Sequence, residues 1–311
     1  MTDKIIPCRK AFTHTILEEA KKNNNIFVVT SDARGSVTLE DFAKELPGQF
    51  VEVGIAEQNA VGVGAGLASC GMNVFVCGPA SFYAARSLEQ VKVDVAYSRN
   101  SVKIIGVSGG VSYGALGSTH HSLHDIAVMR TFPGMNVYLP ADRFQTEQIT
   151  RYLANSGEAA YVRMGRNAVP DVYSSENCFT PGKANILTEG KDLAIIATGE
   201  TVFHSLKAAE ILQNDGISVM VIDMHTLKPI DTNTILEAAK TTGRILTVEE
   251  HSIYGGLGAA VAEVVSQEYP VKMKILGFPD EDVINAKPLE IFEYYGLTAK
   301  GIIASAKKLI E

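Results

Sequence analysis

Apolar and polar positions along the chain form short β-branched runs that alternate with longer segments of helical periodicity. The apolar runs lie at 26–30, 73–78, 102–108, 136–140, 160–164, 192–198, 218–223, 244–250 and 271–277. The periodic segments lie at 12–23, 84–98, 142–155, 201–216, 232–243 and 258–270. Buried parallel strands are continuous apolar runs, and the helices that cover them are amphipathic. The pattern therefore predicts an α/β protein whose mostly parallel sheets are covered by helices on both faces.

One segment interrupts this alternation and predicts a domain boundary. The stretch NAVPDVYSSENCFTPGK, at 167–183, concentrates Pro, Ser, Gly and Asn without any periodicity, as linkers do. A chain of 311 residues has room for two domains of ordinary size. We predict a first domain at 1–170, a linker at 171–185 and a second domain at 186–311. The expected fold class is α/β, with two consecutive three-layer α/β/α domains.

Composition narrows the possible functions. With 46% hydrophobic and 20% charged residues, the chain can bury a substantial core. Its net charge of −7 is spread along the sequence, and the lack of a basic block argues against nucleic-acid binding. The first residues lack the apolar core of a secretion signal, and no apolar run approaches a membrane-spanning length. We expect a cytoplasmic protein that binds neither nucleic acid nor a membrane.

The stretch VEVGIAEQNAVGVGAGLASCG places one acid, Glu57, where an apolar run gives way to a segment of small residues. A helix should begin near Ala56. Small residues recur on one of its faces, at Ala56, Ala60, Gly64 and Ala68. Such a face allows tight core packing, with Glu57 as a first-turn acid favoured by the helix dipole. It equally allows close approach of another helix or a cofactor, so spacing alone leaves both interpretations open.

The glycine-rich stretch YGALGSTHHSLHDIAVMR carries His120, His121 and His124. Histidines in a loop after a strand suit proton transfer or hydroxyl binding near neutral pH, or they only cap a helix or lie on the surface. No HExxH motif accompanies them. The chain's cysteines, Cys8, Cys70, Cys77 and Cys178, show no CxxC spacing. We therefore expect reduced thiols and no metal site within this chain.

Two arginines, Arg163 and Arg166, follow the apolar run at 160–164 in the sequence YVRMGRN. Parallel sheets present ligands at the carboxyl ends of their strands. A guanidinium can bind a phosphate through two parallel hydrogen bonds. An exposed arginine is usually only solvated, so this signal is weak by itself.

Taken in order, several motifs resemble the C-terminal half of the transketolase family. They are GIAEQNAVGVGAGLA, SFYAARSLEQ, GSTHHSLHDIAVMR, MNVYLPAD, YVRMGRN, LKPID and TVEEHSIYGGLGAAVAE. The match covers nearly the full length and is similar to a pyrimidine-binding domain followed by a C-terminal domain, as in the β-type subunits of split transketolases. The resemblance implies a transferase that uses thiamine diphosphate to move a two-carbon ketol unit between sugar phosphates.

For the cofactor, the resemblance implies a role for Glu57. In this family the acid of the GIAEQ motif hydrogen-bonds the N1′ atom of the aminopyrimidine and promotes removal of the thiazolium C2 proton. Enclosure by Ala, Gly and Val desolvates a carboxyl group, which makes its proton-sharing form accessible. Phe82 matches the aromatic residue that stacks on the aminopyrimidine, and Tyr83 takes this part if the alignment slips by one position.

For the substrate, the resemblance implies that His120 contacts the donor sugar's oxygens and assists proton transfers during ketol cleavage. Arg9 resembles an N-terminal phosphate-binding arginine, Ser36 its serine companion and Arg166 the phosphate arginine near the end of the domain. With Arg163 from the strand end, these residues form the predicted substrate-binding set.

The chain departs from the transketolase pattern at two specificity positions. A GEDG-type run appears here as Gly-Ala-Leu-Gly, so Leu116 replaces an aspartate that contacts a sugar hydroxyl, and Ser108 replaces a histidine one strand earlier. An apolar replacement leaves a hydroxyl unpaired, which is costly. We therefore expect a branched, deoxy or otherwise unusual sugar phosphate.

The GDG…N motif that binds the diphosphate through Mg²⁺ in this family is missing from the sequence. A hard cation that holds phosphates needs oxygen ligands. The resemblance thus implies a partner, an N-terminal diphosphate-binding transketolase subunit that supplies the Mg²⁺ ligands in an α2β2 assembly. This chain alone should be inactive.

Three alternative functions stay open. The β subunit of a 2-oxo acid dehydrogenase has a similar length and domain order, and 1-deoxyxylulose-5-phosphate synthase shares the TVEEHSIYGGLG run. A non-catalytic binding or regulatory subunit could also keep the fold. Retention of Glu57, Phe82 and His120 favours an enzyme.

Overall fold

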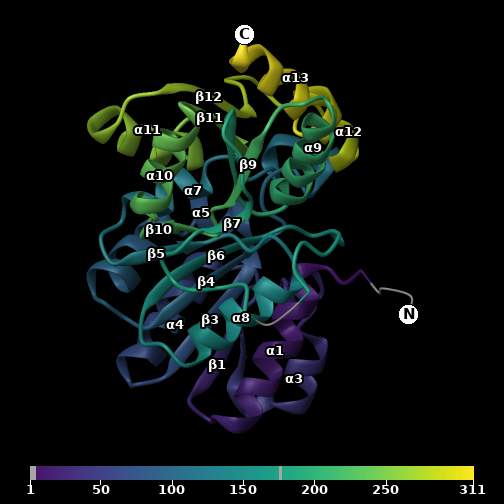
Figure 1. Cartoon of the computed structure of the whole chain (residues 1–311). Coiled ribbons are helices and arrows are strands. Elements are labelled where there is room, and N and C mark those ends of the chain that lie inside the picture. The colour runs from purple at the N-terminus through teal and green to yellow at the C-terminus, as the bar shows by residue number, and fades with distance from the viewer. Residues whose placement is uncertain (1–4, 175–176) are drawn as a thin grey trace.

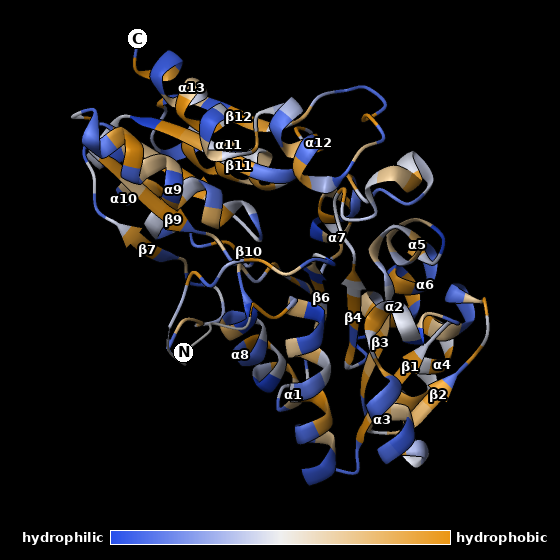
Figure 2. Cartoon of the chain, turned by 90° about the vertical axis from the view of Figure 1, so that its right-hand side faces the viewer, coloured by the Kyte–Doolittle hydropathy of each residue, from blue (hydrophilic) through white to orange (hydrophobic). Residues whose placement is uncertain are grey.

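A computed structural model describes residues 5–174 and 177–311 of the chain. The first four residues of the predicted first domain, and residues 175–176 of the predicted linker, lie outside the described residues. Two sheets organise the molecule, and each is covered by helices on both faces (Figure 1). Apolar residues concentrate in the strands of both sheets, as Figure 2 shows.

The strands and helices follow one another in the alternation that the sequence predicts. The strands are β1 (Ile26–Thr30), β2 (Phe50–Glu52), β3 (Asn73–Pro79), β4 (Val102–Val107), β5 (Met135–Tyr138), β6 (Ala159–Met164), β7 (Asn185–Thr188), β8 (Leu193–Ala197), β9 (Val219–Asp223), β10 (Thr226–Lys228), β11 (Arg244–Ser252) and β12 (Lys272–Phe278). The α-helices are α1 (Cys8–Lys22), α2 (Arg34–Val37), α3 (Glu40–Glu45), α4 (Glu57–Ser69), α5 (Ala80–Ala85), α6 (Leu88–Gln90), α7 (Asp125–Thr131), α8 (Arg143–Ala154), α9 (Thr201–Asn214), α10 (Thr232–Thr242), α11 (Leu257–Glu268), α12 (Pro288–Tyr295) and α13 (Ala299–Ile310). Further helical segments are the 3₁₀-helix η1 (Pro47–Gln49), the π-helix η2 (Val91–Tyr97) and the 3₁₀-helix η3 (Gly114–Thr119).

The first sheet has the strand order β10-β5-β6-β4-β3-β1-β2, and all its strands are parallel except β10. Alternate side chains of a strand point to opposite faces of the sheet. Val74 and Val76 of β3 accordingly join the core beneath α4, whereas Phe75 and Cys77 join the core beneath α1 and α8. Burial on both faces explains why the strand is an uninterrupted apolar run.

The second sheet has the order β12-β11-β8-β9-β7, and its strands are parallel except β7. Ile195 of β8 belongs to the core that includes Ile302 of α13, and Ile196 to the core that includes Ile235 of α10. The fold class, two α/β domains with mostly parallel sheets, is confirmed.

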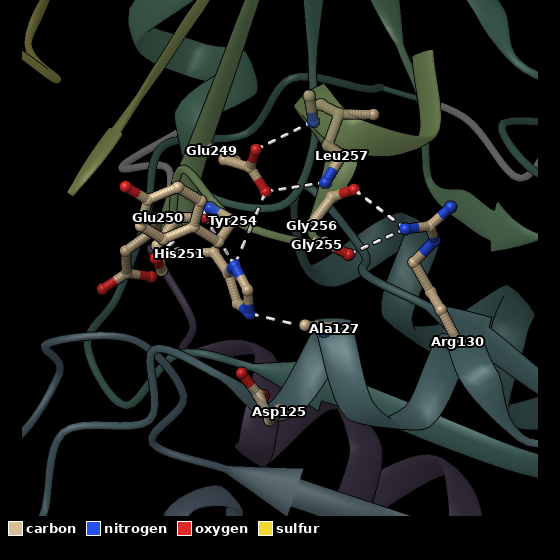
Figure 3. Close-up of polar contacts among 12 residues, drawn as sticks. Asp125, Ala127, Arg130, Glu249, Glu250, His251, Tyr254, Gly255, Gly256 and Leu257 are labelled. Carbon is tan, nitrogen blue, oxygen red and sulfur yellow. Dashed lines mark hydrogen bonds and ion pairs between the residues drawn. The ribbon is translucent and has the colours of Figure 1, made fainter. Parts of the chain in front are cut away.

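The two sheets share contacts, and one apolar core contains residues of both, such as Val76 of β3 and Ile196 of β8. Strand β10 belongs by sequence to the predicted second domain, yet it pairs antiparallel with β5, where Thr226 lies opposite Tyr138. Figure 3 shows a second joint, at which Arg130 of α7 donates to the carbonyl of Gly255 at 2.7 Å. Glu249 of β11 caps α11 in the same region by accepting the amide of Leu257 at 2.7 Å.

Two local differences from the sequence prediction have physical causes. The expected helix at 84–98 is interrupted, because Ser87 leaves helical geometry and its hydroxyl donates to the carbonyl of Tyr83 at 2.9 Å. A serine that bonds back to the preceding turn bends a helix. The strands β2, β7 and β10 were not predicted, since each has only three or four residues and lies at a sheet edge.

Candidate active site

A cavity of about 410 Å³ lies where strands of the first sheet end. In parallel sheets the carboxyl ends of the strands meet at one edge, where ligands bind. Its lining residues come from the end of β3 and from the segments that follow β1, β2, β3 and β4. They are Ser31, Asp32, Ala33, Ser36, Ile55, Glu57, Pro79, Phe82, Arg86, Tyr113 and His120. Four residues of the predicted site, namely Ser36, Glu57, Phe82 and His120, thus line one cavity.

Glu57 is the first residue of α4, and its side chain is almost fully enclosed, with 3% of the residue exposed. Its carboxylate Oε1 accepts a hydrogen bond from Nη1 of Arg86 at 2.7 Å. A buried carboxylate needs such a partner or a hydrogen-bond network to offset its lost hydration. The GIAEQ motif predicts Glu57, whereas none of the motifs assigns a role to Arg86.

Arg86 also contacts the predicted stacking residue. Its guanidinium carbon lies 4.6 Å from the centroid of the Phe82 ring, within the range of a cation–π interaction. Phe82 and Arg86 are four residues apart at the end of α5, and this spacing brings side chains together on a helix. The i, i+4 spacing in SFYAARSLEQ is the sequence signal that could have found this residue.

The structure distinguishes between the two aromatic candidates. Phe82 is half-buried and lines the cavity. Tyr83 is fully buried in the core, and its hydroxyl lies 3.0 Å from Oγ of Ser31. Burial raises the pKa of Tyr83 well above its ordinary value. An enclosed ring offers no face to a ligand, so the cofactor-binding prediction for Tyr83 is corrected.

His120 lies at the cavity between two aromatic rings. Its ring centroid is 5.4 Å from that of Phe82 and 5.3 Å from that of Tyr113, both in edge-to-face geometry. Nδ1 of His120 lies 2.9 Å from Oγ1 of Thr119, which leaves Nε2 as the other polar atom of the ring. The rings and the threonine together fix the orientation of this imidazole.

The loop that carries His120 is held tightly against the second domain. The imidazole of His121 is buried, and its Nε2 donates to the carbonyl of Gly114 at 2.8 Å. Gly117 has a φ of 71°, and a Cβ there would lie 2.6 Å from Oδ1 of Asn285. Glycine is therefore required at this turn.

Arg9, Ser36 and Arg166 come together, as predicted, although Arg9 and Arg166 are 157 positions apart. Arg9 donates through Nε to the carbonyl of Arg166 at 3.1 Å and through Nη1 to the carbonyl of Ser36 at 2.6 Å. Burial lowers the pKa of the Arg9 guanidinium, and the positive charge of Arg166 lowers it further. Nη1 of Arg166 is buried without a hydrogen-bond acceptor among the described residues. Two arginines whose charges interact, one of them with an unsatisfied donor, are suited to an anion.

Arg163 does not belong to this group, and its substrate-binding prediction is corrected. The residue is only 6% exposed, and its Nε lies 3.1 Å from Oδ2 of Asp125. Its Nη2 donates to the carbonyl of Glu250 at 2.7 Å and lies 3.5 Å from the Glu250 carboxylate. These contacts hold the guanidinium between Asp125 of the first domain and Glu250 of the second.

The two specificity positions lie outside the set of described residues that line the cavity. Ser108, at the end of β4, is fully buried in a left-handed conformation with a φ of 57°. Leu116 lies in η3 and is 55% exposed. Their effect on substrate choice stays a prediction.

Among residues 5–174 and 177–311, no cluster of three or more His, Cys, Asp or Glu side chains is arranged to hold a metal ion. The same ranges contain no helix that is long and apolar enough to cross a membrane. The described cysteines are unpaired thiols, of which only Cys70 is exposed.

Comparison with known families agrees with this geometry. The transketolase pyrimidine-binding domain matches residues 4–171, and the transketolase C-terminal domain matches residues 182–302. The chain belongs to the transketolase family. The resemblance that the motifs carried is confirmed, and with it membership of a transferase family that depends on thiamine diphosphate.

Transketolase subunits of similar length are close relatives. An apulose-4-phosphate transketolase subunit of Phocaeicola vulgatus is 59% identical over 312 residues, which cover 100% of both chains. The 6-deoxy-6-sulfo-D-fructose transketolase subunit SqwH of a Clostridium species is 36% identical and covers 97% of this chain and 94% of its own. A solved split-gene transketolase, described as an inactive β4 tetramer, superimposes with a TM-score of 0.88 at 39% identity and covers 98% of both chains.

The residues present fit one half of the transketolase cofactor. An enclosed carboxylate and a half-buried aromatic ring, on the wall of one cavity, suit a planar heterocycle with polar ring atoms. Glu57 and Phe82 would hold the aminopyrimidine of thiamine diphosphate.

Proposed function

We propose that this chain is the C-terminal subunit of a thiamine-diphosphate-dependent transketolase that moves a two-carbon ketol unit between sugar phosphates. The gathering of Glu57, Phe82 and His120 around one cavity, with Ser36 on the same wall, carries the proposal. Family membership and the named functions of the relatives support it.

Each of the site residues of this chain has its own role in the proposed reaction. The bound cofactor supplies a carbanion equivalent at its thiazolium ring. Glu57 holds or releases a proton at the aminopyrimidine edge, and Phe82 orients that ring by stacking. Nε2 of His120 exchanges protons with the sugar oxygens, since Nδ1 is held by Thr119. Fixed side chains need little reorganisation in the reaction, which favours catalysis.

The cluster of Arg9, Ser36 and Arg166 would bind the phosphate at the far end of the sugar. The unsatisfied Nη1 of Arg166 supplies a donor, and Arg9, whose Nε donates to the backbone carbonyl of Arg166, adds a second positive charge. Charge-assisted hydrogen bonds to a phosphate are roughly twice as strong as neutral ones. Anchoring the phosphate would position the reacting carbons near His120.

The assembly that we propose is a cytoplasmic α2β2 heterotetramer. A partner subunit of the N-terminal, diphosphate-binding type would hold the diphosphate and its Mg²⁺. The relative that is 59% identical over both full chains is named as one subunit of a transketolase. The solved split-gene transketolase is described as an inactive β4 tetramer. Both descriptions support this arrangement.

The substrate that we propose is a non-standard sugar phosphate of carbohydrate metabolism. The relatives are named for apulose 4-phosphate and 6-deoxy-6-sulfofructose, and the departures at Ser108 and Leu116 point the same way. Because the relative that is 59% identical is named for apulose 4-phosphate, a branched-chain ketose phosphate is the first compound to test. The standard pentose phosphate xylulose 5-phosphate is the comparison.

The test is reconstitution of the complex from the purified chain and its N-terminal partner, with thiamine diphosphate, Mg²⁺ and an aldose phosphate acceptor. We expect turnover of apulose 4-phosphate only when both chains are present. Replacement Glu57→Gln should lower kcat by about 10²- to 10⁴-fold, the usual range for loss of a positioned proton donor. Activity of this chain alone, or an undiminished rate in the Glu57→Gln complex, would contradict the proposal. Turnover of pyruvate as the donor would instead indicate a synthase of the 1-deoxyxylulose-5-phosphate type.

A further inference from the structure

Tyr113 lies between two parts of the site, the imidazole of His120 and the guanidinium of Arg166. Its ring contacts the imidazole of His120 edge-on, with 5.3 Å between centroids. On the same ring, the guanidinium carbon of Arg166 lies 5.3 Å from the centroid. Tyr113 therefore connects the proposed proton-transfer residue with the proposed phosphate-binding residue.

The backbone around Tyr113 is fixed, so the position of its ring is set by the fold. The hydroxyl of Ser112 donates to the carbonyl of Gly109 at 2.7 Å, and the amide of Gly114 donates to the carbonyl of Val111 at the same distance. The tyrosine ring lines the cavity. A rigid aromatic side chain loses little conformational entropy on binding a ligand, and its flat face packs against carbon.

Tyr113 also contrasts with the positions that differ from the transketolase pattern. Ser108 is fully buried and Leu116 is 55% exposed, and both lie outside the described lining of the cavity. Tyr113 is on that lining, three positions before Leu116 in the same loop. A side chain on the cavity wall acts on the substrate directly, whereas the other two must act through the loop or the partner subunit.

We propose that Tyr113 is a specificity-determining residue of this transketolase and that it acts through its aromatic ring. It forms an apolar wall between His120 and Arg166, and this wall selects ketose phosphates that present carbon, such as a branch or a deoxy position, between the reacting end and the phosphate. The inference rests on the proposed function and adds to it the residue that chooses the sugar. A hydroxyl placed against the ring would lose its hydrogen bonds to water, whereas a carbon branch would pack.

The test uses two substitutions that separate the ring from its hydroxyl. Tyr113→Phe keeps the ring, and Tyr113→Val removes the wall. Tyr294→Val on α12 is the matched control, because Tyr294 is 69% exposed and lies outside the cavity lining. Each reconstituted complex is assayed for kcat and KM with apulose 4-phosphate and with xylulose 5-phosphate. Equilibrium dialysis of thiamine diphosphate gives the cofactor affinity independently of activity.

We expect Tyr113→Val to lower kcat/KM for apulose 4-phosphate by about 10- to 100-fold, the range for one misfitted apolar group in a pocket. The value for xylulose 5-phosphate should change less than about threefold, so the preference between the sugars disappears. Tyr113→Phe and Tyr294→Val should keep the preference, and all three variants should bind thiamine diphosphate within about twofold of the natural chain.

Two results would overturn the proposal. Equal losses for both sugars in Tyr113→Val would mean that the ring does not discriminate between them. A loss of preference in Tyr113→Phe as large as in Tyr113→Val would assign selection to the hydroxyl. Neither result resembles failure of the proposed function, in which the natural complex itself turns over neither sugar or the Glu57→Gln complex retains its rate.

Discussion

At the scale of single residues, Arg86 links the two side chains that the motifs assign to the cofactor. It pairs with Glu57 at 2.7 Å and lies over the ring of Phe82 at 4.6 Å. The motifs identified Glu57, Phe82 and His120, because these positions match a pattern within a few residues of sequence. They could not identify the ion pair, since Glu57 and Arg86 are 29 positions apart and meet only after folding.

A double-mutant cycle tests this ion pair in the isolated chain. Arg86→Met should lower the free energy of unfolding by about 1–2 kcal/mol, because it leaves the enclosed Glu57 carboxylate without its charged partner. In the presence of Glu57→Gln the same replacement should cost about 1 kcal/mol less. Urea unfolding of the four chains measures this coupling.

The control for this cycle is Lys207→Met, which breaks an exposed ion pair with Glu210. Exposed pairs contribute little, so this change should stay within about 0.5 kcal/mol. Strictly additive effects of Arg86→Met and Glu57→Gln would show that the contact does not stabilise the chain.

At the scale of elements, the small residues of α4 pack against the sheet on one face of the helix and meet open space on another. A Cβ on Gly64 would lie 2.6 Å from Cγ2 of Val76, so this glycine allows the helix to approach β3. Gly62 and Gly66 have no heavy atom of the described chain within 4 Å of such a Cβ. Of the two interpretations that spacing left open, tight packing therefore holds for Gly64, and the outward glycines leave room for another surface.

Alanine substitutions on the two faces of α4 should have opposite effects. Gly64→Ala forces the helix away from β3 and should destabilise the chain by about 1–3 kcal/mol. Gly62→Ala meets open space and should stabilise it by up to about 1 kcal/mol through helix propensity alone. Thermal unfolding of both variants measures the difference, and equal shifts would contradict this packing of α4.

The sequence predicted the central elements better than the peripheral ones. Each apolar run of five or more residues, such as 73–78, corresponds to a strand, because burial on both faces leaves a continuous signal. The three-residue strand β2 carries no such signal, and its pairing with β1 depends on the fold. The expected helix at 84–98 failed for a local reason, the bond from the Ser87 hydroxyl to the Tyr83 carbonyl.

At the scale of the whole molecule, buried charges join the two domains. Arg163 of β6 pairs with Asp125 and Glu250, and Glu200, which precedes α9, lies close enough to Glu250 to interact with it electrostatically. Burial raises the pKa of Glu200 and of Glu250, and the charge of Glu250 raises that of Glu200 further, whereas Arg163 opposes both shifts. This explains why a strand-end arginine, which the sequence assigned to substrate, has a structural role.

This joint makes stability depend on pH. A carboxyl whose pKa is raised by folding keeps its proton in the folded chain after the unfolded chain has lost it. Its contribution to stability is therefore complete below the ordinary pKa of about 4.5 and is lost as the pH rises through the raised value. Lys103 has the opposite effect on the pH dependence of stability, because burial lowers its pKa to about 7. A variant that removes only the carboxyl group is therefore needed to measure the effect of Glu200.

Between pH 6.5 and pH 8.5 we expect the free energy of unfolding to fall less steeply with rising pH in Glu200→Gln than in the natural chain. The difference between the two slopes should reach about 1 kcal/mol per pH unit, which approaches the value for one proton. Urea unfolding in matched buffers measures it. His225 and His251, whose pKa values burial lowers to about 4, are present in both chains, so their contributions cancel in the difference between the two slopes. Parallel slopes would rule out a proton held by Glu200.

Strand β10 has a practical consequence for anyone who recombines relatives of this chain. Residues 226–228 come late in the sequence but complete the edge of the first sheet beside β5. In a chimera with its crossover near residue 180, β5 would come from one parent and the strand that pairs with it from the other. A truncation near residue 180 would remove that strand and expose the backbone of β5, which favours aggregation. A chimera of two relatives should therefore take residues 226–228 from the same parent as residues 135–138.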